Sequence, residues 1–473
     1  MKILTTDLRG ISREPTLRCD YDYHEYKREI AGACYMFADL FKLNDSSAVD
    51  ADDLYVDFRY CEIGNADKAG DVEPELLNFD NRDLLTENYY KKIEGGDIIP
   101  VTAGDILISK VRPNLKKYVR ITPDLADCYF TSAFISLCPK RLTVILYYAL
   151  RTLFYQNLVA ISRQGKGYPT LNVNDLRLMQ FDKAVIDTLA ANEERLTREI
   201  IEIEEQIRTR KATIRPAADI INEVFGREFG FDYAEFKRLK AIKVYPSETA
   251  SFSNNVDLRF SAKFHRGAGA FVLAQLAAIT EKKVKHYLAE PIVLGTSVSP
   301  VDYSDDGEFY YISMATIKRC VFDREAAQTV TEEFSDAKQA KTIRKDDIIL
   351  ARSGEGTIGK VALIDDEELQ GVFADFTMRI RLTGYNQRFA YYYFRTAYFQ
   401  YLIEVHKKGL GNNTNIFPSM IQEFPLIDIP STEQQRIVNE IQTELDRHEA
   451  TRRDIATLRE QIEAKIVQAV ATA

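Results

Sequence analysis

The sequence predicts an α+β protein in which two repeated α/β units are separated by two long helices that form an antiparallel coiled coil. Two observations predict this fold: an internal repeat at a spacing of about 242 residues, and a long helical stripe of apolar residues after each copy. The 473 residues, 45% of them hydrophobic, are enough for about three domains with ordinary cores. A predominantly disordered chain is therefore excluded.

The repeat consists of five short patterns that recur in the same order, while the spacing between the copies grows only from 241 to 244 residues. The first copies lie at Leu17, Arg18, Tyr23 and His24, at 105–108, at Phe130, at Arg151 and Thr152, and at Gly165, Gly167 and Thr170. The second copies lie at Leu258, Arg259, Phe264 and His265, at 347–350, at Phe373, at Arg395 and Thr396, and at Gly409, Gly411 and Thr414. We therefore expect one globular unit over residues 1–183 and its copy over residues 227–430.

A long helix is predicted after each unit, over residues 184–226 and 431–473. Apolar residues follow steps of three and four along both, at Ile186, Leu189, Leu196, Ile200, Ile203, Ile207 and Ile214, and at Ile441, Leu445, Ile455, Leu458, Ile462 and Ile466, with His448 inside the second stripe. Pro216 should interrupt or kink the first helix, and Ser431 with Gln434 predicts a capping box in the second. Two such helices at equivalent places in a repeat favour pairing with each other over packing on their own domains.

Charge is unevenly distributed along the chain. The 62 basic and 71 acidic side chains give a net charge of −9, which at face value argues against binding to nucleic acid. Residues 36–100, however, carry 16 acidic and 6 basic side chains, so the remainder is close to neutral. Three stretches are strongly basic, at residues 104–120, 140–177 and 376–408. The net charge therefore does not exclude a DNA-binding surface.

Several classes of site are not supported by the sequence. The six Cys include no pair at the Cys-x-x-Cys spacing and the five His are scattered, which predicts reduced thiols and no metal site. No apolar run reaches the roughly 18 residues of a membrane span and no signal sequence is recognisable, so we expect a cytoplasmic protein without membrane contact. No methyltransferase, dinucleotide-binding or nuclease motif is present, and no catalytic residue is predicted.

Residues 354–360 match a phosphate-binding loop, but the pattern then fails. Val361 stands where a Ser or Thr should hold magnesium, and the following residues are typical of a strand rather than of the helix that this motif requires. The corresponding stretch of the first unit has no such pattern. We therefore expect a strand, a Gly-rich turn and a strand here, forming a basic hairpin in each unit, and an ATPase is disfavoured.

Long cations on turns are the features that indicate DNA binding. A second loop, after each aromatic helix, combines glycines with cations and amides, which suits close approach to phosphates and to adenine edges. A solvated surface charge or an ordinary Gly/Asn turn is the alternative for each of these residues. The candidates are Lys110, Arg112, Lys116 and Lys117 on the first hairpin, Arg352, Ser353 and Lys360 on the second, Arg163, Lys166 and Tyr168 on the first loop, and Lys407, Lys408, Asn412, Asn413 and Asn415 on the second.

Together these patterns resemble the specificity subunits of type I restriction-modification systems. The resemblance lies in the two Leu-Arg openings, the two hairpins, the two Gly-containing loops, and residues 429–437, which lead into the last helix. It covers essentially the whole chain. The first unit departs from the family pattern, because no Pro-x-x-x-Glu-Gln precedes its helix and Arg112 with Pro113 replaces the usual Ser-Gly turn.

This resemblance implies a non-catalytic DNA reader with two target-recognition domains, each reading one half of a bipartite target, while the helices set the spacer. The implied partners are double-stranded DNA, two DNA methyltransferase (M) subunits docked along the helices and, in the full complex, restriction (R) subunits. No cofactor is then expected in this chain, because S-adenosylmethionine, ATP and magnesium would belong to those partners. The acidic segment 36–100 is expected to face away from DNA.

Two other functions stay open on the sequence. The recognition subunit of a related system, in which methyltransferase and nuclease are fused in one partner, would look nearly identical. A coiled-coil scaffold protein without sequence-specific DNA contact would tolerate changes at Lys110, Arg352 or Lys408 without a DNA phenotype.

Overall fold

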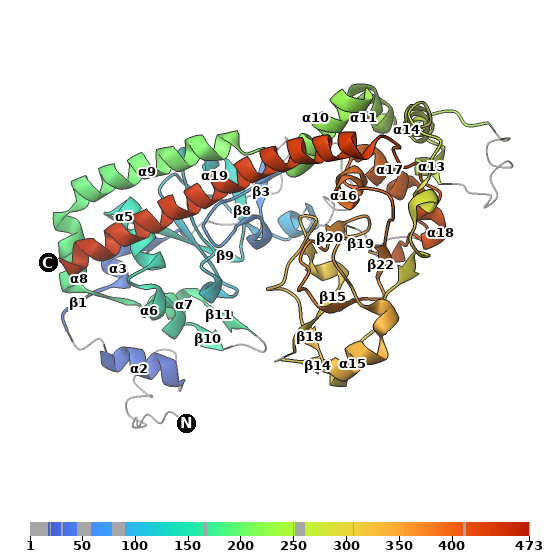
Figure 1. Ribbon diagram of the computed structural model, residues 1–473. Helices are drawn as coiled ribbons and strands as arrows, with labels where there is room; N and C mark the ends of the chain where they lie inside the picture. Colours follow the sequence, from blue (N-terminus) through green and yellow to red (C-terminus); the bar gives the residue numbers. More distant parts are fainter. Residues whose placement is uncertain are drawn as a thin grey trace. The chain divides into compact units, whose positions relative to one another are not determined.

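The computed structural model describes residues 18, 20–29, 32–44, 58–77, 90–164, 168–248, 250, 261–305, 307–354, 356–409 and 413–472. The chain divides into two compact units: the first comprises Met1–Ala212 and Arg452–Ala473, and the second comprises Thr213–Thr451. Each unit combines small β-sheets with helices (Figure 1), which confirms the predicted α+β class. The functional boundaries at residues 183, 227 and 430 stay a prediction.

Two four-stranded sheets form the body of the first unit. One has the order β2 (Phe41–Leu43), β9 (Phe134–Pro139), β6 (Ile106–Ser109) and β7 (Tyr118–Arg120), with antiparallel neighbours throughout. The other has the order β4 (Glu75–Leu77), β3 (Phe58–Cys61), β8 (Cys128–Thr131) and β5 (Ile98–Ile99), and β3 runs parallel to β8. Ile106, Leu107 and Ile108 are fully buried, because β6 is covered on both faces.

Helices and two short ladders complete the first unit. The ladders pair β1 (Cys34–Met36) with β12 (Gln180–Asp182), and β10 (Arg163–Gln164) with β11 (Pro169–Thr170). The helices are α2 (Tyr21–Glu29), α3 (Phe37–Leu40), α5 (Thr143–Arg151), α6 (Tyr155–Ala160), α7 (Val173–Leu176), α8 (Lys183–Ala191) and α9 (Glu193–Thr213). Asn172 and Asp182 cap α7 and α8, because each side chain accepts a hydrogen bond from a first-turn amide.

The second unit has a similar sheet plan, which differs at the edges of its second sheet. One sheet has the order β13 (Val293–Leu294), β22 (Thr377–Ile380), β19 (Ile348–Ala351) and β20 (Val361–Leu363). The other has the order β14 (Tyr303–Ser304), β18 (Thr329–Val330), β15 (Phe309–Ile312) and β21 (Gly371–Phe373), with β15 parallel to β21. A short ladder joins β16 (Ile317–Lys318) to β17 (Val321–Phe322).

Aromatic residues dominate the helical core of the second unit. Its helices are α10 (Ala217–Phe229), α11 (Tyr233–Ala241), α13 (Ala262–His265), α14 (Gly267–Ala277), α15 (Glu332–Ala337), α16 (Gln387–Phe394), α17 (Ala397–His406) and α18 (Pro418–Ile421), followed by the start of α19 (Ser431–Ala471). Phe225 of α10 packs against Phe389 and Tyr393 of α16, with ring centroids 5.4 and 6.1 Å apart. All three side chains are fully buried.

The internal repeat is visible in the strands. β6, β7, β8 and β9 correspond to β19, β20, β21 and β22 at spacings of 242 to 243 residues, and each central strand pairs antiparallel with both of its neighbours. The structure therefore confirms two copies of one unit. Leu17, Leu258 and Arg259, which belong to the first pattern of the repeat, lie outside the described residues.

The long helices pair antiparallel within each unit. In the first, α9 runs beside the C-terminal part of α19 (Figure 1), and Lys465 of α19 pairs with Glu199 of α9 at 2.6 Å. In the second, the N-terminal part of α19 pairs with α10 through Arg227 and Glu440, at 2.6 Å. The apolar stripe is buried as predicted at Ile200, Ile207, Ile441, Ile462 and Ile466. This confirms the predicted antiparallel pairing.

The prediction of one long helix over residues 184–226 is wrong, because this region contains α8, α9 and α10. The break before Pro216 was expected, since proline cannot continue the helical hydrogen bonds. The break at Asn192 was not expected. The Asn192 side-chain amide donates to the Thr188 carbonyl at 2.9 Å, and such local bonds compete with the helical backbone.

The predicted capping box at the start of α19 is also wrong. The Gln434 amide donates to the Ile429 carbonyl at 2.8 Å, and its oxygen accepts the Asn386 backbone N–H at 2.9 Å. Gln434 is buried and its side chain therefore satisfies backbone groups outside the helix instead of the first turn of α19.

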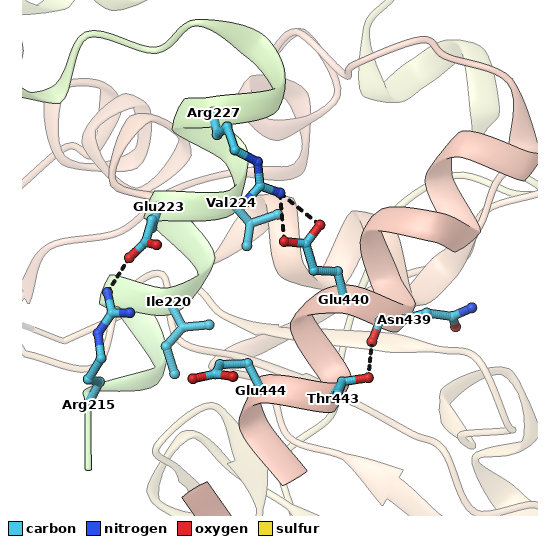
Figure 2. A pocket seen from close by; sticks show the side chains of 9 residues that line it. All are labelled: Arg215, Ile220, Glu223, Val224, Arg227, Asn439, Glu440, Thr443 and Glu444. Carbon is cyan, nitrogen blue, oxygen red and sulfur yellow. Dashed lines mark hydrogen bonds and ion pairs between the residues drawn. The ribbon is translucent and has the colours of Figure 1, made fainter. Parts of the chain in front are cut away.

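A hollow of about 500 Å³ lies between α10 and α19 in the second unit. Figure 2 shows its lining, in which Arg215 pairs with Glu223 and Arg227 pairs with Glu440. Glu444 and Thr443 of α19 face the same hollow. The hollow is therefore a charged feature of the paired helices rather than part of the sheet body.

The described residues give no sign of a metal centre or a membrane span. The five cysteines among them are free thiols. In the same part of the chain, no group of three or more His, Cys, Asp or Glu side chains is placed to hold a metal ion. Nor is any helix there both long and apolar enough to cross a membrane.

Candidate nucleic-acid interface

The two predicted DNA-binding loops of the first unit are joined side by side. The turn between β6 and β7 meets the β10–β11 loop through the Arg112 N–H, which donates to the Pro169 carbonyl at 2.9 Å. The Leu171 N–H donates to the Lys110 carbonyl at 2.8 Å, and Val111 forms an isolated antiparallel β-bridge with Thr170. Two distant stretches of sequence, at residues 110–112 and 169–171, therefore lie next to each other.

The second unit contains the same junction. The Gly354 N–H donates to the Thr414 carbonyl at 3.1 Å, and the Ile416 N–H donates to the Arg352 carbonyl at 2.9 Å. Ser353 forms an antiparallel β-bridge with Asn415, which corresponds to the β-bridge between Val111 and Thr170. Thr170 therefore corresponds to Asn415, and the sequence-based match of Thr170 with Thr414 is wrong by one residue, because the second unit has one more residue before this bridge.

Arg112 and Lys116 occupy conformations that normally require glycine. Their φ angles are 51° and 54°, whereas the corresponding positions of the second unit are Gly354 and Gly359, with φ of 84° and 88°. A side chain in the left-handed region costs about 1 kcal/mol. These two cations are therefore present despite backbone strain, and observed strain of this kind is concentrated at functional positions.

Both strained cations are held over aromatic rings of the same unit. The Arg112 guanidinium lies 5.3 Å from the centroid of the exposed Tyr168 ring. The Lys116 ammonium lies 4.4 Å from the Tyr155 ring. Such contacts orient a cation without neutralising it. The sequence missed Tyr155, because its distance from Lys116 along the chain gives no sign of the contact.

Three other candidates of the first unit also serve as structural anchors. The Lys110 ammonium donates to the Ser132 carbonyl, and the Lys117 ammonium donates to the Ile63 carbonyl at 2.8 Å. Burial lowers the pKa of Lys117, an effect that nearby Asp67 opposes. Arg163 forms a bidentate ion pair with the fully buried Asp175, at 2.8 to 2.9 Å.

Arg352 is the most completely oriented candidate of the second unit. Its Nε donates to the Asp375 carbonyl at 3.0 Å, and one terminal nitrogen donates to the Asn415 side-chain oxygen at 3.1 Å. The other terminal nitrogen has no hydrogen-bond partner among the described residues. The outer edge of this guanidinium can therefore still donate to a base or phosphate.

The remaining candidates differ in what the structure says of them. Ser353 is buried and donates to the Thr414 carbonyl at 3.3 Å, which makes it part of the junction. Lys360 and Lys407 are half-buried, whereas Lys408 and Asn413 are exposed. Lys166 and Asn412 lie outside the described residues.

The segment that resembles a phosphate-binding loop is a hairpin, as predicted. Residues 354–360 connect β19 to β20, whose register pairs Leu350 with Val361. The helix whose N-terminus would face phosphates is replaced by the strand β20. The ATPase interpretation therefore finds no support in this geometry.

Part of the acidic segment 36–100 faces the paired helices. Asp71 forms ion pairs with Lys211 of α9 and Arg459 of α19. Burial raises the pKa of Asp71, but the ion pairs with Lys211 and Arg459 outweigh it and the pKa is lowered. Residues 45–57 and 78–89 of this segment lie outside the described residues, and its orientation relative to DNA stays a prediction.

Comparison with known proteins identifies one domain. Residues 295–463 match the family described as Type I restriction modification DNA specificity domain. This range runs from the sheets of the second unit into α19. The match confirms the resemblance found in the sequence. Among curated proteins, none matches this chain.

Solved structures resemble the chain only distantly. A chain from work on complex assembly and conformational transition of the type I R-M system is 14% identical, with a TM-score of 0.38 over 93% of this chain and 97% of that one. The HsdS subunit from Thermoanaerobacter tengcongensis is 14% identical, with a TM-score of 0.31 over 93% and 96%. The type I S subunit from M. genitalium is 12% identical, with a TM-score of 0.38 over 93% and 95%.

Proposed function

We propose that this chain, whose residues 295–463 match the Type I restriction modification DNA specificity domain, is a DNA sequence-specificity subunit and that each of its units reads one half of a bipartite target. The observation that carries this proposal is the repeated junction of two loops. In both units it joins the turn after the central strand to the loop after the aromatic helices, and it presents long cations. Two equivalent but chemically different surfaces suit two different half-targets.

Arg352 and Arg112 are the residues to which we assign base or phosphate contacts. The Arg352 outer edge keeps the two donors that a guanine major-groove edge accepts in bidentate fashion. Arg112 is retained in a strained conformation and is oriented by Tyr168. Lys116, Lys360 and Lys408 then neutralise phosphates.

Catalysis belongs to partners in this proposal. Two DNA methyltransferase subunits dock along the paired helices, where the charged hollow between α10 and α19 supplies polar partners such as Arg215, Asn439 and Glu444. S-adenosylmethionine, ATP and magnesium are used by the methyltransferase and restriction subunits. The complex acts in the cytoplasm, where its DNA substrate lies.

Methylome sequencing of a host that expresses this chain with its methyltransferase tests the proposed function. We expect a two-part motif with a non-specific spacer of roughly six to eight base pairs, if the two units read the same groove face about one helical turn apart. Replacement of residues 1–183 by those of another specificity subunit should change one half of the motif only. A change in both halves, or in neither, would contradict the modular assignment.

Point variants assign each junction to its half-target. Arg112→Ala should weaken discrimination in one half and Arg352→Ala in the other, by about 1–3 kcal/mol for each lost bidentate contact. Arg344→Ala is the matched control, because Arg344 is an exposed arginine beyond the opposite end of β19 from Arg352. An unchanged motif in Arg112→Ala and Arg352→Ala would contradict the assignment of base contacts to these two residues, whereas the absence of any motif in the wild type would support a scaffold that does not read DNA.

A further inference from the structure

Phe376 is an exposed aromatic residue fixed beside Arg352. It lies in the tight turn between β21 and β22, where the Thr377 N–H donates to the Ala374 carbonyl at 2.9 Å. The Arg352 N–H donates to the Phe376 carbonyl at 2.9 Å, so the backbones of the two residues are locked together. The Phe376 ring nevertheless remains 44% exposed. The backbone of Phe376 is therefore fixed by hydrogen bonds, while its ring is accessible to a ligand.

The Phe376 ring and the Arg352 guanidinium form one composite surface. The guanidinium carbon lies 5.9 Å from the ring centroid, within the range of a cation–π contact. Asp375 and Asn415 hold the same guanidinium from two other directions. A polar donor edge and an apolar ring are thus presented together by a rigid turn, at the junction that we assign to DNA.

The first unit lacks this ring. The Lys110 N–H donates to the Ala133 carbonyl at 2.9 Å, which is the bond that Arg352 makes with Phe376 in the second unit. Lys110 also anchors on the Ser132 carbonyl, as Arg352 does on Asp375. The fold therefore needs the backbone bonds but not the ring. Phe376 is a feature of the second unit alone.

We propose that Phe376 is a specificity-determining residue that contacts the 5-methyl group of a thymine next to the base pair contacted by Arg352. The thymine methyl is the one apolar group that base edges display in the major groove, and an aromatic ring is a suitable partner for it. This inference rests on the proposed function. It specifies that the half-target of the second unit contains an A·T pair beside the pair contacted by Arg352.

Replacement of thymine by uracil tests the contact, because it removes the methyl group and leaves every hydrogen bond of the base pair. The assembled complex with its methyltransferase is titrated with target duplexes in which each thymine of this half-target is replaced in turn. For the wild type, one replacement should raise Kd about fourfold, which corresponds to the loss of one buried methyl. For Phe376→Ala, the same replacement should change Kd by less than about 1.5-fold, because the ring that contacts the methyl group is absent.

Two further variants separate this contact from a general loss of stability. Phe376→Leu keeps an apolar group and should retain most of the thymine preference. Leu273→Ala removes a side chain of similar exposure, 40%, from α14 and should leave that preference unchanged. A thymine preference that persists in Phe376→Ala, or no thymine preference in the wild type, would overturn the inference. If the wild type binds target and scrambled duplexes equally, the proposed function itself fails.

Discussion

The two units attach the rest of their fold to the long helices with different chemistry. In the first, charged pairs make the attachment: Asp71 with Lys211 and Arg459, and Arg120 with Glu204. In the second, neutral acceptors on α19 make it: Gln434 accepts from Asn386, and the Gln442 oxygen accepts from Tyr392 at 2.6 Å and from Arg388 at 3.1 Å.

This difference sets how each attachment responds to solution conditions. Ion pairs at partly exposed positions are screened by salt, because the Debye length falls from about 10 Å at 0.1 M to about 3 Å at 1 M. Hydrogen bonds to a neutral acceptor are far less sensitive to salt. We call the attachment of the first unit to the long helices the first joint and that of the second unit the second joint. The first joint is therefore expected to be sensitive to salt and the second to be insensitive to it.

The largest expected effect is that of Phe225→Ala, which tests the apolar part of the second joint. Phe225 is fully buried against Phe389 and Tyr393, so its truncation should lower the free energy of unfolding of this unit by about 3–5 kcal/mol. Hydrogen exchange resolved by peptide measures the two units separately. Phe417→Ala, at a ring that is 39% exposed, is the control and should change little. A loss in the free energy of unfolding below about 1 kcal/mol would contradict the predicted role of the aromatic core.

A smaller effect is expected for Gln434→Ala. This change leaves the Asn386 N–H and the Ile429 carbonyl without their partner, which should cost about 1–3 kcal/mol in the second unit. The loss should be the same at low and high salt, because no charge is removed. Exchange rates of α16 and of residues 431–451 at 0.1 M and 1 M sodium chloride measure it. A loss that shrinks at high salt would remove the distinction between the joints.

Asp71→Asn should destabilise the first joint by about 1 kcal/mol at low salt, because the side chain is 35% exposed and its ion pairs are partly screened. This loss, unlike that of Gln434→Ala, should largely disappear at high salt. Exchange of α9 and of residues 452–471 measures it. Glu73→Gln is a control within the same segment, because Glu73 is exposed and is not a partner in the pairs with Lys211 and Arg459.

The smallest expected effect is a pH dependence of the same joint. The pKa of Asp71 is lowered in the folded chain, so its stabilising contribution is fully present above the unfolded pKa of about 3.9. The contribution is lost as the pH falls below that value and through the folded pKa. The difference in stability between wild type and Asp71→Asn should therefore be constant between about pH 5 and 7 and shrink below about pH 4. A difference that grows on acidification would contradict the lowered pKa.

Sequence patterns predicted the parts of the fold that depend on periodicity and order. The repeat led to the right correspondence of β6 with β19 and of β9 with β22, and the apolar stripe identified residues that are buried between the paired helices. The break at Asn192 and the side-chain contacts of Gln434 were not predictable in this way. Both depend on the polar group with which a side-chain amide forms a hydrogen bond. For Gln434 that group is the Asn386 N–H, at the start of another helix.

The candidate site was predicted as a set of residue types rather than as an arrangement. Composition selected Arg112 and Arg352, but also Arg163, whose charge is paired with the buried Asp175. A cation on a loop has the same sequence signal whether it is free or paired. Phe376 was missed because a single phenylalanine after a strand has no distinguishing pattern, and its exposure follows only from the turn that holds it.

By itself, the sequence determined that this chain is a duplicated α+β unit with paired helices and basic loops, because periodicity and order survive in one dimension. Only the tertiary structure decided which loops meet, which cations keep a free edge and which anchor the fold. Those properties depend on hydrogen bonds between residues tens of positions apart, such as the bond from the Gly354 N–H to the Thr414 carbonyl. Distance along the chain does not encode them.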